Sequence, residues 1–150
     1  EATVTACTVN ATPSAVDTSV TRVIGSYVGD RIFGDSGDEN LIGGGGQDWL
    51  EGRGGDDVLT GGADQDVFAF AFGDGTDTIT DFRNGQDLIA LSGLDFGTAS
   101  GQATFLNALL VGGLGSDSAL VVSDGSGGAS QTLAILSNTS ISGLDVDDIL

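Results

Sequence analysis

Large apolar residues recur at every ninth position in the first half of the chain, each after a Gly-rich, acidic segment. These residues are Ile32, Leu41, Leu50, Leu59 and Phe68. A single apolar side chain with one neighbour on each side suits a very short strand that directs one face inward. Glycine tolerates positive φ and lets two backbones approach closely, so each segment before a strand predicts a tight turn. The pattern predicts turn and strand in alternation over residues 25–69.

In register, residues 25–69 form five nine-residue repeats: GSYVGDRIF, GDSGDENLI, GGGGQDWLE, GRGGDDVLT and GGADQDVFA. The first position is always glycine, the sixth always acidic and the eighth always large and apolar. The acids are Asp30, Glu39, Asp48, Asp57 and Asp66. Turn and strand units with this fixed period wind into a flattened solenoid whose apolar positions meet in a thin core. We therefore expect an all-β fold, a parallel β-roll in which two repeats make one coil.

Stacking of the coils brings acidic side chains together, because repeats two apart lie on the same side of such a solenoid. The same-side pairs are Asp30 with Asp48, Glu39 with Asp57, and Asp48 with Asp66. Like charges at this range repel, and a hard cation resolves the repulsion. Calcium accepts about six to eight oxygens, from carboxylates and from the carbonyls that Gly-rich turns expose, whereas magnesium prefers a compact octahedron and keeps its waters. We expect about three internal calcium sites and one or two more at the column ends, so about three to five ions in all.

The repeats resemble the GGxGxDxUx nonapeptides of RTX proteins, the calcium-binding parallel β-roll family. GGGGQDWLE fits at every defining position, and GRGGDDVLT lacks only the second glycine. GDSGDENLI carries Glu39 where aspartate is usual, and the additional methylene moves the carboxylate; Asn40 and Asp38 are candidates to assist that site. GGADQDVFA has Asp64 in place of the fourth glycine, which suits the last complete turn of a roll.

After residue 69 the repeat pattern becomes incomplete but does not end. FGDGTDTIT keeps glycine at 73 and 75, Asp77 and Ile79, and a second remnant holds Gly85, Asp87 and Ile89. The segment DTITDFRNGQDLIALSGL resembles the one that follows the roll in the C-terminal domains of serralysin-type proteases and other type I secreted proteins. There it continues the sheet and caps the roll, which a solenoid needs because its last coil would otherwise expose the core and an unpaired edge.

Pattern and resemblance together give a set of candidate calcium-binding residues, acids that supply charge and turn residues that supply oxygens. The acids are Asp30, Glu39, Asp48, Asp57, Asp64, Asp66, Asp77 and Asp87. The turn glycines are Gly34, Gly37, Gly43, Gly44, Gly46, Gly52, Gly55 and Gly61. A flexible acidic linker is the alternative for so Gly-rich a stretch, but linkers do not place an apolar residue at every ninth position.

Three parts of the chain are expected. Residues 1–24 predict one or two strands or a linker, residues 25–91 the RTX β-roll, and residues 92–150 a β-rich cap. In the cap, ATFLNALLV, SALVVS and QTLAIL are strand candidates, and DGSGGAS predicts a turn that joins the last two into a hairpin. The tail SISGLDVDDIL resembles the uncleaved secretion signal of type I secreted proteins. It also suits an ordinary short helix or final strand, and the two interpretations are compatible.

Charge excludes several function classes. The net charge is −18, with four Arg and no Lys, which argues against nucleic-acid binding and against direct insertion into or contact with anionic membranes. The chain has no His, which excludes a histidine base, a Ser-His-Asp triad and the usual zinc sites. Asp56/Asp57 and Asp147/Asp148 are the acid pairs to consider for glycoside hydrolysis. Asp57 is already assigned as a ligand and the other pair has no pocket-forming context, so we predict no enzyme.

Cys7 is the one cysteine, so no internal disulfide framework forms. An opening Glu suggests a fragment or a processed chain, and no N-terminal signal peptide or membrane-spanning stretch is visible. Weak calcium sites need the calcium of the extracellular space. The expected location is therefore secreted, extracellular or at the cell surface, with the type I secretion machinery as partner and the C-terminal signal as the route.

Two further functions stay open. Side chains that flank the eighth position point away from the core, so Phe33, Trp49 and Val67 are candidates for an apolar outer stripe. Residues 1–24 or the cap strands are expected to cover it. In the first alternative the stripe is exposed and the chain is a polysaccharide- or protein-binding module of a secreted enzyme, in which Arg31 and Arg53 could contact acidic sugars. In the second alternative, copies of the chain stack into a surface layer, adhesin or filament.

Overall fold

The structure, a computed structural model, describes residues 2–5, 20–92, 110–114, 117–123 and 130–137. Every regular element in these ranges is a strand. The strands are β1 (Ala2–Thr5), β2 (Val20–Ile24), β3 (Arg31–Phe33), β4 (Asn40–Gly44), β5 (Trp49–Glu51), β6 (Val58–Gly62), β7 (Val67–Ala71), β8 (Asp77–Ile79), β9 (Leu88–Ser92), β10 (Leu110–Leu114), β11 (Asp117–Ser123) and β12 (Ser130–Leu136). Cys7, Asp147/Asp148, the tail and most of the strand expected at 103–111 lie outside the described residues.

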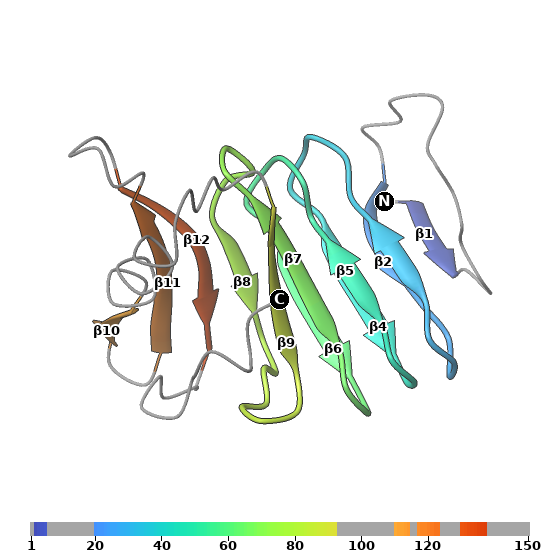
Figure 1. Cartoon of the computed structure of the whole chain (residues 1–150). Coiled ribbons are helices and arrows are strands. Elements are labelled where there is room, and N and C mark those ends of the chain that lie inside the picture. The colour runs from blue at the N-terminus through green and yellow to red at the C-terminus, as the bar shows by residue number, and fades with distance from the viewer. Residues whose placement is uncertain (1, 6–19, 93–109, 115–116, 124–129, 138–150) are drawn as a thin grey trace.

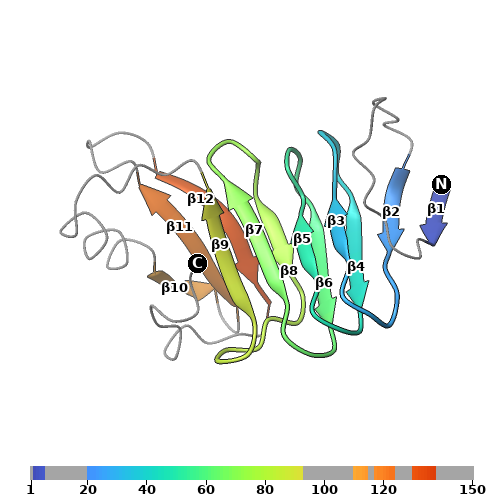
Figure 2. The ribbon, with the colours of Figure 1, turned by 45° about the vertical axis from the view of Figure 1, so that its right-hand side comes forward.

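Two sheets face each other, and successive strands of the roll alternate between them (Figures 1 and 2). One sheet has the order β1-β2-β4-β6-β8-β12-β11-β10, and the other has the order β3-β5-β7-β9. All pairs from β1 to β9 are parallel. The expected all-β parallel β-roll is confirmed.

The register follows the repeat. Trp49 pairs with Arg31 on one side and with Val67 on the other, and Leu41 pairs with Leu59 in the opposite sheet. Repeats two apart therefore lie directly above one another. The stacking begins before the first repeat, since Val23 of β2 pairs with Leu41.

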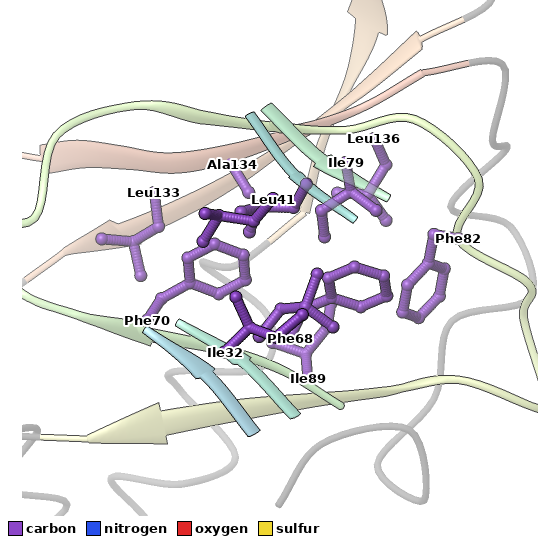
Figure 3. Close-up of a cluster of buried hydrophobic side chains, with 12 residues drawn as sticks. Ile32, Leu41, Phe68, Phe70, Ile79, Phe82, Ile89, Leu133, Ala134 and Leu136 are labelled. Carbon is purple, nitrogen blue, oxygen red and sulfur yellow. The ribbon is translucent and has the colours of Figure 1, made fainter. Parts of the chain in front are cut away.

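The eighth-position side chains form the core between the two sheets. Ile32 is 3% exposed, and Leu41, Leu50, Leu59 and Phe68 are fully buried. Figure 3 shows Ile32, Leu41 and Phe68 together with Ile79 and Ile89 from the later coils, and Phe82 beside Phe68. The ring centroids of Phe68 and Phe82 are 6.1 Å apart. Burying one such side chain contributes about 1.5–3 kcal/mol, so a thin core is sufficient only because the same layer repeats in every coil.

The described strands of the cap continue one of the two sheets. β11 and β12 are antiparallel, which confirms the expected hairpin, and β12 pairs in parallel with β8. Leu133, Ala134 and Leu136 are buried and join the core of the roll. The backbone N–H of Ser137 donates to the Ile79 carbonyl at 2.9 Å, so the hairpin covers the otherwise open edge of the last coil in that sheet.

Candidate metal centre

The sixth-position acids form two buried ladders, one along each edge of the roll where the turns stack. None of these side chains is more than 7% exposed, although carboxylates are rarely buried without a partner. One ladder holds Asp30, Asp48, Asp66 and Asp87, and the other holds Glu39, Asp57 and Asp77. The two acids of the decayed repeats therefore continue the ladders beyond the five nonapeptides.

One oxygen of each stacked aspartate accepts a hydrogen bond from the coil before it. The backbone N–H of Asp30 donates to Asp48 Oδ1 at 2.8 Å, and that of Glu39 donates to Asp57 Oδ1 at 2.7 Å. The same bond joins Asp48 to Asp66, Asp57 to Asp77, and Asp66 to Asp87. These bonds hold each carboxylate in a fixed orientation between two turns.

The second oxygen of most of these carboxylates is buried and has no hydrogen-bond partner. These oxygens are Oδ2 of Asp48, Asp57, Asp66 and Asp77, and Oδ1 of Asp30. A buried acceptor without a partner costs about 1–3 kcal/mol, and more when it is charged. Four of these oxygens, the Oδ2 atoms, lie at equivalent places in successive turns, which is the arrangement that bound cations would satisfy.

Glycine at the first position is required because carboxylate and carbonyl oxygens lie where a side chain would begin. A Cβ on Gly43 would lie 2.2 Å from Asp48 Oδ2, and one on Gly61 would lie 2.3 Å from Asp66 Oδ2. The carbonyl of Gly43 in turn approaches Gly25, whose Cβ would lie 2.2 Å from it. Carbonyl oxygens of one coil are thus packed against the turn of the next, beside the buried acids.

The remaining predicted turn glycines also hold close backbone approaches. Gly44, Gly46 and Gly55 have positive φ, and a Cβ on Gly55 would lie 2.1 Å from the Gly37 carbonyl. Gly34 and Gly52 occupy first positions, and their Cβ atoms would meet the oxygens of the acid in the same turn. A side chain at any of these five glycines would therefore need a neighbouring backbone atom or a ladder carboxylate to shift.

Burial disfavours the charged form of the ladder acids. It is the main reason that the pKa is raised to about 6 for Asp48, Asp57 and Asp66, and to about 7 for Glu39 and Asp77. The backbone hydrogen bonds oppose this effect, and repulsion by neighbouring acids adds to it. A bound cation would reverse the balance by favouring the ionised form.

The donor set fits calcium. In the described ranges, no three Asp, Glu, Cys or His side chains converge on one point, so an ion between two turns must draw on backbone carbonyls as well as carboxylates. Calcium accepts such mixed oxygen ligands in flexible geometry, whereas zinc prefers nitrogen and sulfur. When bound, calcium would supply positive charge between stacked carboxylates. Its effect would be to stabilise the folded roll and not to act on a substrate.

Glu39 Oε2 accepts the Asp35 N–H at 3.1 Å, which is the same bond that Asp30 and Asp87 make within their turns. The Glu39 site differs because neither Glu39 oxygen is both buried and unpartnered, whereas Oδ1 of the adjacent Asn40 is. Asn40 therefore remains a candidate to assist this site. Asp38 Oδ1 instead accepts the N–H of Asp56 at 2.9 Å, on the exposed side of the turn.

Asp64 is not brought to the buried carboxylates. The φ of Asp64 is +73°, close to the +71° of Arg53. The Asp64 side chain is exposed, and its Oδ2 accepts the Gly46 N–H at 3.3 Å. Its carbonyl accepts a hydrogen bond from the Gln86 side chain. Asp64 thus joins neighbouring turns on their outer side.

Three residues near the ladders were not anticipated. Ser26 donates to Asp30 Oδ2 through its N–H at 2.7 Å and through its hydroxyl at 2.8 Å. Asp81 accepts the N–H groups of Gly61 and Gly62 at 2.9 and 2.8 Å. Arg83 reaches Asp66 and Asp87. Ser26 stands at the second position of a repeat, a signal that was available, whereas the other two follow the repeats and have no fixed position.

The outer side chains of the smaller sheet do not form one apolar stripe. Trp49 is in register with Arg31 and Val67, but Phe33 lies in the next row, opposite Glu51. The guanidinium of Arg31 lies 5.4 Å from the Trp49 ring, and that of Arg53 lies 5.1 Å from the Phe33 ring. The expected stripe is therefore divided in two, because the seventh and ninth positions are two residues apart, and each aromatic ring is partly covered by arginine.

The roll has the repeat, the fold and the ladder of buried oxygens that define a calcium-binding β-roll. Residues 30–68 match the family model of the RTX calcium-binding nonapeptide repeat, in four copies. This segment consists of RTX repeats, as its resemblance implied. No helix in the described part of the chain is long and apolar enough to cross a membrane.

Other comparisons are more distant. No curated protein matches the chain. Among solved structures, the solution structure of the AlgE6R3 subunit from the Azotobacter vinelandii mannuronan C5-epimerase is similar, with 27% sequence identity and a TM-score of 0.32. The alignment covers 83% of this chain and 80% of that one.

Proposed function

We propose that this chain is a calcium-dependent folding module of a secreted bacterial protein, and that it supports export and folding of the protein to which it is attached. The unpartnered oxygens of the buried carboxylate ladders carry this proposal. Without a cation, the buried acids of the compact roll are unfavourable in either form. If they are charged, they repel one another, and if they are neutral, they must take up protons at neutral pH. With calcium, the same acids become ligands.

Binding energy then becomes folding energy. The stacked acids come together only when the coils stack, so calcium binds the folded roll far better than the unfolded chain. The net charge of −18 strengthens the effect, since it favours the expanded chain until cations neutralise part of it. Calcium concentration therefore sets the state of the chain.

The calcium concentration is low in the cytosol and higher outside the cell, so the calcium-dependent coils would fold after export and not before. Low cytosolic calcium leaves these coils unfolded, so that they can thread a secretion channel, and calcium outside folds them. RTX repeats are typical of secreted proteins, and the resemblance of residues 77–94 to segments of type I secreted proteins supports the type I machinery as the route. Folding outside would oppose backward movement and help the attached part fold.

A calcium titration by isothermal calorimetry, with circular dichroism and light scattering on the same samples, tests the proposal. We expect several ions to bind, a transition from coil to β structure in the monomer, and little response to magnesium. An unchanged circular dichroism spectrum at millimolar calcium would refute the folding switch. Growth in particle size would instead favour a structural subunit that assembles with its own copies.

A binding role for the smaller sheet is the second candidate. The Arg31–Trp49 and Arg53–Phe33 pairs place positive charge over aromatic rings on its outer face, a combination that suits acidic sugars. Titration of the calcium-loaded protein with an acidic polysaccharide, followed by Trp49 fluorescence, tests it. A neutral glucan is the matched control, and equal responses to both would exclude recognition of acidic groups.

A further inference from the structure

Arg83 is the basic residue that contacts the buried ladders within the described part of the chain. It stands at the second position of the last turn, because its N–H donates to Asp87 Oδ2 at 2.7 Å. Ser26 makes the same bond to Asp30 at the first turn of this ladder. Arg83 therefore projects from a place that the repeat defines, although the sequence there no longer follows the repeat.

The guanidinium of Arg83 lies between the last two acids of the ladder. Its Nη2 is 4.0 Å from Asp66 Oδ2, and its Nε is 3.8 Å from Asp87 Oδ2. It also donates a hydrogen bond to the Gly62 carbonyl. Two carboxylate oxygens and a turn carbonyl are the kinds of oxygen that the earlier turns offer to calcium, and here a cation of the chain itself contacts them.

The equivalent carbonyls earlier in this ladder have a different partner. The Ser26 carbonyl accepts the N–H of Gly45, and the Gly44 carbonyl accepts that of Ala63, each at 2.9 Å. Stacked acids in the repeats are 18 residues apart, whereas Asp66 and Asp87 are 21 apart. The longer turn gives the Arg83 side chain the space to reach the Gly62 carbonyl.

Arg53 shows that an arginine at a second position does not by itself enter a ladder. Its side chain is 41% exposed, nearly the same as the 40% of Arg83. Arg53 also donates to a turn carbonyl, that of Gly34 at 3.3 Å, but its acid partner is Glu51 at 3.5 Å and it lies over the Phe33 ring. The position of Arg83 between two buried acids is therefore specific to the last turn.

We propose that Arg83 is a tethered cation that takes the place of a calcium ion between Asp66 and Asp87. The inference rests on the proposed calcium binding by the other acid pairs. It divides the roll into two parts: pairs of acids that need calcium, and a last coil in which one positive charge already lies between the two acids. The end of the roll next to the cap is then formed before calcium arrives and offers a template on which the earlier coils stack.

Counting bound calcium by native mass spectrometry tests the replacement. We expect the Arg83→Ala variant to bind one calcium ion more than the wild type, and the Arg53→Ala variant to bind the same number. The Arg83→Lys variant, which keeps a tethered positive charge, should also match the wild type. An unchanged count in Arg83→Ala would overturn the proposal. No calcium on the wild type would instead refute the proposed function on which it rests.

Amide hydrogen exchange of the wild-type chain without calcium tests the preformed coil and needs no variant. The N–H groups of Trp49, Val67 and Leu88 donate to the carbonyls of the ladder acids, each at 2.8 Å. We expect Leu88 to exchange at least about tenfold more slowly than Trp49 in the presence of a chelator, and calcium to remove most of that difference. Equal exchange of Leu88 and Trp49 without calcium would overturn the proposal.

Discussion

The backbone N–H of Asp48 donates to Oδ1 of Asp66 at 3.0 Å, across two stacked turns of the roll. This one bond leaves Asp66 with a second carboxylate oxygen that is buried and has no hydrogen-bond partner. The backbone thus orients the acid and a further positive group is needed to satisfy it. Because the same bond recurs along both ladders, the need recurs with it, and the following predictions depend on that arrangement.

Replacement of Asp57 by Asn should weaken calcium binding at least about tenfold, or about 1.4 kcal/mol. The amide oxygen can still accept the Glu39 N–H, but the charge that holds the ion is lost. Asp56→Asn is the matched control, since Asp56 is adjacent, exposed and equally charged, and its Oδ1 accepts the Thr76 N–H. Calorimetric titration of both variants measures the difference. Equal losses in the two would mean that net charge, and not the buried position, determines affinity.

Acid should partly replace calcium. The pKa values of Asp48, Asp57 and Asp66 are raised to about 6 in the folded roll, so folding takes up protons. The calcium-free roll is therefore stabilised at low pH, and this stability is lost as pH rises through about 6 to 7. Circular dichroism in chelator should show more β structure at pH 5 than at pH 8. The opposite order would contradict the raised pKa values.

Calcium affinity should change with pH in the reverse direction. Protons compete with the ion for the same carboxylates, whose pKa is raised to about 7 for Glu39 and Asp77. Binding should weaken as pH falls from 8 to 5, and binding at about pH 5, where the calcium-free roll is stabilised in its protonated form, should release protons. Calorimetry in two buffers of different ionisation enthalpy measures the release. A release of zero protons at pH 5 would show that the acids are already ionised in the unloaded chain.

Gly43→Ala should destabilise the calcium-loaded roll by about 1–3 kcal/mol, because the added methyl would overlap oxygens of Asp48 and Gly61. Gly45→Ala in the same turn is the control. A Cβ there would have Tyr27 Cα as its nearest neighbour, at 3.6 Å. Urea unfolding at saturating calcium compares the two, and similar stabilities would show that the turn can open to admit a side chain.

Leu59→Ala should cost about 2–5 kcal/mol, since Leu59 is fully buried in the thin core. The neighbouring Val58 is 36% exposed on the outer face, and Val58→Ala should have a small effect. Both changes remove side-chain volume from the same strand. A comparable loss in the two would indicate that the outer face is also packed.

The repeats made most of the roll predictable. An apolar residue at every ninth position fixes both the alternation between sheets and the register, and the pattern extends to Val23, nine residues before Ile32. The acids were predictable for the same reason. Their hydrogen bonds were not, since the sequence does not tell which carboxylate oxygen the preceding coil satisfies.

The end of the roll could not be predicted in this way. Stacked acids become 20 and 21 residues apart after Asp57 and Asp66, so positions can no longer be counted from the repeat. This shift places Phe82, which follows two polar residues, in the core beside Phe68. It also gives Asp81 and Arg83 roles that depend on the geometry of a single irregular turn.

Each inner acid of a ladder lies between two turns. With calcium bound, carboxylates and calcium ions would therefore alternate along the ladder, as anions and cations alternate in a row of a salt crystal. Parallel strands lie about 4.8 Å apart, so successive ions would be separated by about that distance, with Asp48 between them in one ladder and Asp57 in the other. Such an alternating row is held most firmly in its middle, where each charge has neighbours on both sides, and least firmly at its ends. Longer arrays of the same repeat should therefore hold each ion more tightly than shorter ones, and ions should leave from the ends first.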